Sequence, residues 1–209
     1  MWKSGKIFSD MVARYPSLLN GRSVLEVGSG TGILGLSLAL SMKHTDKRFA
    51  LKRLCLTDFL GPVLLNMRHN VLVNGLDLLP DDVENVGASS GPLAVEVKKL
   101  DWGRSDGFRL YDFDTIIGSD LIADPLAATL LCALLHKFLR RKRCKSGREP
   151  EVFLTIQRRQ EATLQKFFDD AEQAGLVLDV LQEFEGHVLL LNVTAARSPA
   201  EASSGPTQP

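Results

Sequence analysis

The order of apolar and polar residues predicts short buried strands that alternate with helices. Strand-like runs lie at residues 24–27, 53–57, 93–98, 113–118 and 151–156, and two more, 176–181 and 187–193, are typical of a closing antiparallel pair. Helical spacing occurs at residues 34–40, 62–73, 126–139 and 161–174, and in a segment that ends at Pro16. Residues 77–92, rich in Asp, Gly, Ser and Pro, predict an exposed connection. We therefore expect an α/β fold with a seven-stranded, mostly parallel sheet and helices on both faces.

Length and composition favour one domain. A chain of 209 residues with 44% hydrophobic residues suits a single α/β domain, which we expect at residues 1–194, and the Ser-, Ala-, Pro- and Gly-rich residues 195–209 predict a disordered tail. The 25 basic and 25 acidic residues cancel, so the net charge provides no general attraction to nucleic acid or to an anionic membrane. We expect a monomer that binds neither of them directly.

The sequence carries no clear targeting or metal-binding pattern. No apolar run approaches the roughly 20 residues that span a bilayer, and the first five residues lack a signal-peptide core. We expect a cytoplasmic location. The basic run at residues 140–145 fits either a nuclear signal or a solvated loop after a helix. Three dispersed cysteines and four histidines show no ligand spacing, so we expect reduced thiols and no metal.

The most distinctive stretch is a strand, a glycine turn and a helix at residues 24–40. Closely spaced glycines let the backbone turn sharply because they carry no Cβ. Glu26, Gly28, Ser29 and Gly30 lie where an α/β protein commonly holds a nucleotide-like ligand. The alternative interpretation is a turn that only packs the strand against the helix.

Charge discriminates between the possible ligands of this turn. The spacing Gly30-x-Gly32-x-x-Gly35 formally fits the dinucleotide pattern, but Glu26 precedes it and no Lys or Arg occurs between residues 24 and 42. A carboxylate repels a diphosphate and attracts a ligand that carries an ammonium and a sulfonium, as S-adenosylmethionine does. A P-loop is excluded, because no Gly-Lys-Ser/Thr follows the glycines. The turn therefore predicts an S-adenosylmethionine site.

Two further strand ends supply candidates for the nucleoside part of this ligand. Asp58 ends the second strand, where a carboxylate meets ribose hydroxyls in this architecture, although a helix cap is also compatible with its position. Asp101 and Trp102 follow the third strand and suit the amino group and the face of adenine, respectively. A tryptophan that only shields an edge of the core is the alternative for Trp102.

A second stretch of candidate chemistry follows the fourth strand. This strand brings Ser119 and Asp120 to the same carboxyl edge as Gly28. The Asp120 carboxylate suits either the ammonium of the methionine part or an incoming amine, and we predict Asp120 as the catalytic residue. Asp124, directly before a proline, is more typical of a helix cap.

In their order along the chain these motifs, together with Trp2 before the first helix, resemble the class I, seven-strand protein lysine methyltransferases. The resemblance runs from Trp2 to about residue 193, and it looks most like the elongation factor 2 lysine methyltransferase branch through residues 70–76, 100–102 and 149–152. It implies a Rossmann-like methyltransferase fold. The implied cofactor contacts are Trp2, residues 28–30, Asp58, Trp102 and Ser119. An aromatic anchor in the core is the alternative for Trp2.

The activity that the resemblance implies is methylation of a lysine side chain in a protein, with an elongation factor 2-like translation factor as the leading expectation. Two departures from the family bear on it. Ala123 stands where the family usually has Tyr in an Asp-x-x-Tyr element beside the lysine channel, and the chain begins almost at Trp2, without the N-terminal segment of relatives. A small-molecule methyltransferase and an inactive S-adenosylmethionine-binding scaffold protein therefore stay open as alternatives.

Overall fold

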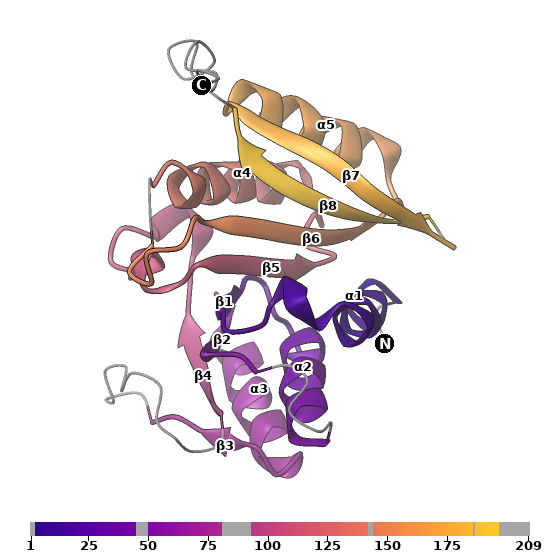
Figure 1. Cartoon of the computed structure of the whole chain (residues 1–209). Coiled ribbons are helices and arrows are strands. Elements are labelled where there is room, and N and C mark those ends of the chain that lie inside the picture. The colour runs from indigo at the N-terminus through magenta and orange to yellow at the C-terminus, as the bar shows by residue number, and fades with distance from the viewer. Residues whose placement is uncertain (1–2, 45–49, 81–92, 142–143, 186, 197–209) are drawn as a thin grey trace, which may run out of the picture.

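The described residues form one mixed sheet with helices on both faces (Figure 1). The computed structural model of the chain describes residues 3–44, 50–80, 93–141, 144–185 and 187–196. Its strands are β1 (Ser23–Glu26), β2 (Arg53–Asp58), β3 (Asp77–Leu78), β4 (Ala94–Lys99), β5 (Thr115–Ser119), β6 (Glu151–Gln157), β7 (Leu176–Phe184) and β8 (Val188–Ala195). Its helices are α1 (Lys3–Arg14), α2 (Ile33–His44), α3 (Gly61–Val73), α4 (Pro125–Leu139) and α5 (Glu161–Gln173), with the 3-10 helices η1 (Pro16–Leu18), η2 (Trp102–Arg104) and η3 (Leu110–Asp112).

Strand order and direction confirm the predicted α/β architecture. The order is β3-β4-β2-β1-β5-β6-β8-β7, and all neighbours from β3 to β6 are parallel, whereas β8 runs antiparallel to β6 and β7. The strand count differs from the prediction, since the described residues contain eight strands. The additional strand, β3, pairs with β4 over two residues only and lies in the stretch that we expected to be an exposed connection. A strand of two residues is too short to produce an alternating pattern.

The hydrophobic core lies in two layers, one on each face of the sheet. Buried residues of α1, α2 and α3 pack on one face, and those of α4 and α5 pack on the other. Along β1 the side chains alternate between the layers, with Val24 in the first and Leu25 in the second. The central strands are therefore buried on both faces, as parallel strands in α/β folds are. None of the described helices combines the length and the apolar character needed to cross a membrane.

The strand order creates a ligand-binding position at the carboxyl edge of β1. From β1 the chain continues through α2 to β2 on one side, whereas β5 pairs with β1 on the other side. Open α/β sheets bind ligands where the strand order reverses in this way. The residues that follow β1, β2, β4 and β5 therefore meet at one edge.

Two further predictions concern the start of α4 and the last strand of the sheet. Asp124 caps α4 by accepting a hydrogen bond from the Ala127 amide at 2.9 Å, so its predicted capping role is confirmed. The last strand continues to Ala195, and the Ala196 amide donates to the Gly175 carbonyl at 2.8 Å. The sheet thus reaches into the first residues of the expected tail, and residues 197–209 lie outside the described part of the chain.

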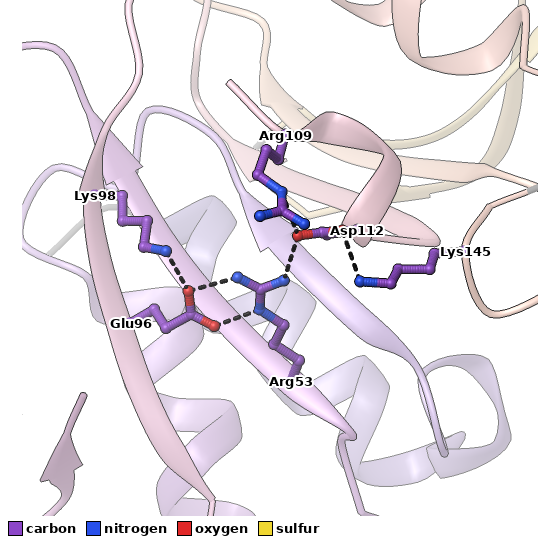
Figure 2. Close-up of polar contacts among 6 residues, drawn as sticks. All are labelled: Arg53, Glu96, Lys98, Arg109, Asp112 and Lys145. Atoms are coloured by element: carbon purple, nitrogen blue, oxygen red, sulfur yellow. Dashed lines mark hydrogen bonds and ion pairs between the residues drawn. The ribbon is translucent and has the colours of Figure 1, made fainter. Parts of the chain in front are cut away.

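A buried ion-pair network links β2 and β4 to η3 (Figure 2). Arg53 on β2 forms a bidentate pair with Glu96 on β4, through Nε to Oε1 and through Nη2 to Oε2 at 2.6 Å. Arg53 Nη1 also donates to Asp112 Oδ2 at 3.3 Å. Three further basic residues, which are less buried than Arg53, complete the network, namely Lys98, Arg109 and Lys145. Both acids in the network therefore have basic partners supplied by the fold.

Candidate active site

The glycine turn after β1 adopts a backbone that glycine favours. Gly28, Gly30 and Gly32 have φ angles of 59°, 56° and 82°, in the left-handed region. A Cβ on Gly28 would lie 2.8 Å from Leu121 Cδ2 and 3.1 Å from Trp102 Cζ2, whereas a Cβ on Gly30 would meet no atom within 4 Å. Gly28 is therefore packed against the core, and Gly30 faces open space. The turn leaves room beside its backbone, as a ligand-binding turn requires.

Hydrogen bonds hold this turn to β2. The Ser29 amide donates to the Thr57 carbonyl at 2.8 Å, and Ser29 Oγ accepts from the Thr57 amide at 3.0 Å. The Thr57 hydroxyl donates to the Glu26 carbonyl at 2.7 Å. Ser29 is buried and bonded within the protein. Its predicted contact with a cofactor remains a prediction, while its structural role is to fix the turn.

Glu26 is buried at the foot of the turn, with 2% of its surface exposed. Its Oε2 accepts a hydrogen bond from the Gly35 amide at 2.7 Å, and a Cβ on Gly35 would lie 2.4 Å from the same oxygen. Burial raises the pKa of Glu26 to about 8, although the hydrogen bonds from Gly35 and Ser29 act in the opposite direction. The carboxyl is therefore largely protonated at neutral pH and would ionise beside a cationic ligand.

Asp58 fixes the chain at the other side of the turn. Its Oδ2 accepts from the Gly30 amide at 3.1 Å, and its Oδ1 accepts from the amides of Phe59 and Leu60 at 2.8 and 3.1 Å. Helix α3 begins at Gly61, its N-cap residue is Leu60, and no side chain caps it. The capping interpretation of Asp58 is therefore wrong. The carboxylate retains acceptor capacity for ribose hydroxyls, which stays the predicted role.

Two adjacent hollows line the carboxyl edge of the sheet. The first hollow, of about 360 Å³, lies among Glu26, residues 28–31, Ser119, Asp120, Ala123, residues 156–157 and residues 159–160. The second hollow, of about 460 Å³, lies among Gly28, Asp58, residues 100–102, residues 120–121 and the start of α4. Gly28, Asp120 and Ala123 line both hollows, so the hollows meet at these three residues. Together they form the candidate site.

The second hollow contains the predicted nucleoside contacts. Trp102 lies in η2, lines this hollow and also packs against the core, so it shields the core as its alternative interpretation expected, while its contact with adenine stays a prediction. Asp101 is the N-cap of η2 and accepts from the Gly103 amide at 2.9 Å through Oδ1. Its other carboxylate oxygen remains for the adenine amino group. The site brings Asp58, Asp101 and Trp102 into one cavity, as the sequence predicted.

Ser119 and Asp120 reach the first hollow from the end of β5. Ser119 Oγ lies 3.2 Å from the Oγ of Ser4, a buried residue in the first turn of α1. A Cβ on Gly5 would lie 3.3 Å from the same oxygen, so the start of α1 packs tightly on Ser119. Trp2, which the resemblance implies as a cofactor contact, lies outside the described residues.

Asp120 has an unusual backbone and a partner that the sequence did not reveal. Its φ angle is 59°, although it is not a glycine, and such strained residues cluster at functional sites. Its Oδ2 accepts from Arg159 Nη2 at 2.6 Å. Burial raises the pKa of Asp120, and the positive charge of Arg159 partly offsets this effect.

Several residues of the first hollow were missed from the sequence. They are Gln157 at the end of β6, Arg159 and Gln160 in the loop after it, and Thr163 in α5. The available signal was the position of this loop at the carboxyl end of a parallel strand, where ligand contacts gather. Within the described residues, no group of three histidine, cysteine or acidic side chains is placed to hold a metal ion.

Comparison with known proteins connects the chain to a family of enzymes. A family model described as lysine methyltransferase matches residues 1–174. The human protein-lysine N-methyltransferase EEF2KMT is 28% identical over 205 residues, which cover 92% of this chain and 58% of that protein. The human putative protein N-methyltransferase FAM86B1 is 28% identical over 177 residues, which cover 84% of this chain and 50% of that protein. The chain thus spans about half the length of these two relatives.

Solved structures show the same fold at low sequence identity. The glycopeptide N-methyltransferase MtfA, complexed with (S)-adenosyl-L-methionine, gives a TM-score of 0.58 at 11% identity, over 90% of this chain and 87% of that one. A methyltransferase from Pyrococcus furiosus gives a TM-score of 0.56 at 16% identity, over 88% of this chain and 80% of that one. At these identities the likeness concerns the fold alone.

Proposed function

The chain belongs to the lysine methyltransferase family, and we propose that it is an S-adenosylmethionine-dependent protein-lysine N-methyltransferase. The observation that carries the proposal is the junction of the two hollows at Gly28, Asp120 and Ala123. A bisubstrate reaction needs two adjoining compartments, one for the nucleoside of the cofactor and one in which an acceptor meets the reacting group. The described residues supply both at the carboxyl edge of the sheet.

The residues present fit S-adenosylmethionine. In the second hollow, Asp58 would accept from the ribose hydroxyls, and Asp101 with Trp102 would bind adenine. In the first hollow, the buried carboxyl of Glu26 suits the ammonium of the methionine part. The open space beside Gly30 admits the ligand close to the backbone. Among the residues that line the second hollow are four aspartates and no Lys or Arg, which suits an uncharged nucleoside better than a diphosphate.

The protein contributes mainly orientation to the proposed reaction. When bound, S-adenosylmethionine supplies an electrophilic methyl group to the nitrogen of the acceptor. Holding the two reactants in line contributes up to about 7 to 11 kcal/mol in well-oriented cases. Asp120, at the junction of the hollows, would orient the lysine nitrogen through a hydrogen bond. Partial burial of the first hollow lowers the pKa of a lysine amine and so favours its neutral, nucleophilic form.

Further parts of the proposal concern the substrate protein, the location in the cell and the oligomeric state. We propose an elongation factor 2-like translation factor as the substrate protein, supported by the similarity to the human protein-lysine N-methyltransferase EEF2KMT and by the sequence resemblance. We further propose that the protein acts as a cytoplasmic monomer, with the nucleus as a second location, and that it binds no nucleic acid directly. The balanced net charge supports the last of these proposals.

Ala123 supports a second candidate, an S-adenosylmethionine-binding scaffold that has lost catalysis. This residue lines both hollows where the resemblance implies a tyrosine, so an aromatic hydroxyl is missing at the junction. A scaffold of this kind would bind the cofactor and transfer no methyl group. A gain of activity on Ala123→Tyr would support loss of catalysis in the present chain.

Two measurements test the proposed function. Calorimetry with S-adenosylmethionine and S-adenosylhomocysteine tests the cofactor site, and we expect both to bind. Incubation with methyl-labelled cofactor and a cell extract, or purified elongation factor 2, then tests transfer, and we expect a labelled protein that yields methyl-lysine on hydrolysis. Labelled metabolites would favour a small-molecule methyltransferase, and binding without label would favour the scaffold. Absence of binding would refute all three functions.

A matched pair of variants connects the transfer to the site. Asp120→Asn keeps the size of the side chain and removes its charge, and we expect transfer to fall by about 10- to 100-fold, the value of a hydrogen bond to a charged group. Asp169→Asn, on the exposed side of α5, makes the same chemical change away from the hollows and should leave transfer unchanged. Equal activities of the two variants would exclude Asp120 from the reaction.

A further inference from the structure

The ion pair between Asp120 and Arg159 lies inside the first hollow, where the proposed function places the acceptor amine. Arg159 follows β6 and reaches across to the residue that follows β5. Its Nη2 lies 2.6 Å from Asp120 Oδ2, and Gln157 Oε1 accepts from its Nε at 3.2 Å and from the same Nη2 at 2.9 Å. Two acceptors therefore hold the guanidinium in one orientation.

The backbone also directs Asp120 toward this pair. The Asp120 amide donates to the Thr155 carbonyl at 2.8 Å, which ties the left-handed residue to β6. The side chain of Asp120 is 15% exposed and that of Arg159 is 41% exposed. Asp120 is thus fixed and largely desolvated, whereas Arg159 approaches it from the solvent side.

Three charged or titratable side chains line the first hollow among the described residues. The charged or titratable groups are Glu26 from β1, Asp120 after β5 and Arg159 after β6. The other polar groups are hydroxyls and side-chain amides from the glycine turn, from the end of β5, from β6 and the loop after it, and from α5. Arg159 is therefore the one cation among these lining residues, and it neutralises the one carboxylate at the junction of the hollows.

This neutralisation matters for a lysine acceptor. An isolated carboxylate within about 4 to 6 Å raises the pKa of an amine by 1 to 3 units and so holds it as an ammonium, which has no lone pair for methyl transfer. A guanidinium beside the carboxylate cancels that effect, and a nearby like charge lowers the pKa of an amine. Asp120 can then accept a hydrogen bond from the amine without stabilising its protonated form.

We propose that Arg159 is a positioning residue that neutralises Asp120, so that the acceptor lysine lies against Asp120 as a neutral amine. This inference rests on the proposed lysine methyltransferase function. The acceptor ammonium loses one proton to bulk water, its nitrogen lone pair forms the new N–C bond, and the electron pair of the broken S–C bond stays on sulfur. The pairing of Asp120 and Arg159 thus takes the place of a dedicated general base.

The test is the pH profile of methyl transfer, measured from pH 6 to pH 10 with Arg159→Gln. We expect the midpoint of the rising limb to move up by about one pH unit and the rate at pH 7 to fall about tenfold. The rates of the two proteins should converge as pH rises toward 10, since a growing share of the amine is then neutral in either protein. Arg159→Lys keeps the charge and should restore the original midpoint.

Two controls separate this role from a structural one. Arg158→Gln removes the neighbouring positive charge, on a residue outside the lining of the first hollow, and should leave the profile unchanged. Calorimetry with S-adenosylhomocysteine should give equal affinities for the wild type and Arg159→Gln. A uniform loss of rate at every pH, or a weakened affinity for S-adenosylhomocysteine, would overturn the inference and make Arg159 a structural or cofactor-binding residue. A wild type that binds this ligand but transfers no label would instead refute the proposed function, and the inference with it.

Discussion

Two glutamates in the same sheet, Glu26 on β1 and Glu96 on β4, are buried to the same extent, with 2% of each exposed. Glu96 forms a bidentate pair with Arg53 and lies 3.0 Å from Lys98 (Figure 2). Burial alone would raise the pKa of Glu96, but the hydrogen bonds and charges of Arg53 and Lys98 hold it below its usual value. Among the described residues Glu26 has only the Gly35 amide and Ser29 as partners, and burial raises its pKa to about 8.

The comparison separates a carboxylate that stabilises the fold from one that is reserved for a ligand. The protein supplies the counter-ion of Glu96 itself, so this residue is ionised in the folded chain. Glu26 lines the first hollow and has no counter-ion among the described residues. A bound cation would supply it. The difference in pKa therefore favours Glu26, of the two acids, as the one that binds the proposed ligand.

The largest expected effect comes from breaking the buried ion pair between Arg53 and Glu96. Arg53→Met leaves Glu96 and Asp112 without their central cation, and we expect the free energy of unfolding to fall by about 3 to 5 kcal/mol, as for other broken buried pairs. Urea denaturation at pH 7 measures it. The double variant Arg53→Met/Glu96→Leu removes both charges and should recover part of the loss. A loss below about 1 kcal/mol in the single variant would show that the pair is dispensable.

A smaller effect, on binding instead of folding, is expected at Glu26. Glu26→Gln keeps an oxygen for the Gly35 amide and removes the charge available to a cationic ligand. We expect the affinity for S-adenosylhomocysteine, measured by calorimetry, to fall about 10- to 100-fold, while stability near neutral pH changes by less than about 1 kcal/mol. Glu172→Gln on α5 is the surface control. An unchanged affinity would place the ligand ammonium away from Glu26.

The smallest effect is the pH dependence of ligand binding. The pKa of Glu26 is about 8 in the folded protein and near 4.5 without burial, so its protonated form favours folding, and this contribution declines as pH rises from about 4.5 through 8. A cationic ligand favours the ionised form. We therefore expect binding near pH 7 to release up to one proton, with affinity increasing by at most about tenfold, or 1.4 kcal/mol, per pH unit between pH 6 and 8.

Calorimetry in buffers of different ionisation enthalpy detects the released proton, and Glu26→Gln should abolish it. Glu96 has the opposite dependence, because its pKa is lowered in the folded state. The stability that it contributes is present above about pH 4.5, its value without the fold, and is lost as pH falls below that value. Proton uptake on binding, or none in the wild type, would contradict the assignment of Glu26.

The position of the site could be predicted from the sequence, because it follows from the ends of parallel strands. Glu26, Asp58 and Asp120 each come directly at or after a strand end, and strand ends of a parallel sheet share one edge. The raised pKa of Glu26 could not be predicted, since it depends on how deeply the carboxyl is buried. The same pattern also suggested a helix cap for Asp58, which the start of α3 at Gly61 excludes.

The ion pairs Arg53–Glu96 and Arg159–Asp120 could not be predicted from the sequence for a different reason. Arg53 and Glu96 are 43 residues apart, and they meet only because the register places Cys55 opposite Glu96 on adjacent parallel strands. Arg159 and Asp120 are 39 residues apart and lie on loops after neighbouring strands. Charges near or within strand-like runs carry no periodic signal, so such pairs require the register of the sheet.

Gly35 has a consequence for how glycine motifs should be interpreted. Any side chain at this position would overlap Glu26 Oε2 and Leu56, so the last glycine of a spacing shared with NAD-binding proteins here creates the space for an acid. The same glycine spacing is therefore compatible with an anionic ligand in one protein and with the proposed cationic ligand in this one. Redesign of this domain toward a nicotinamide dinucleotide would have to begin by replacing Glu26, while all three glycines of the spacing could be kept.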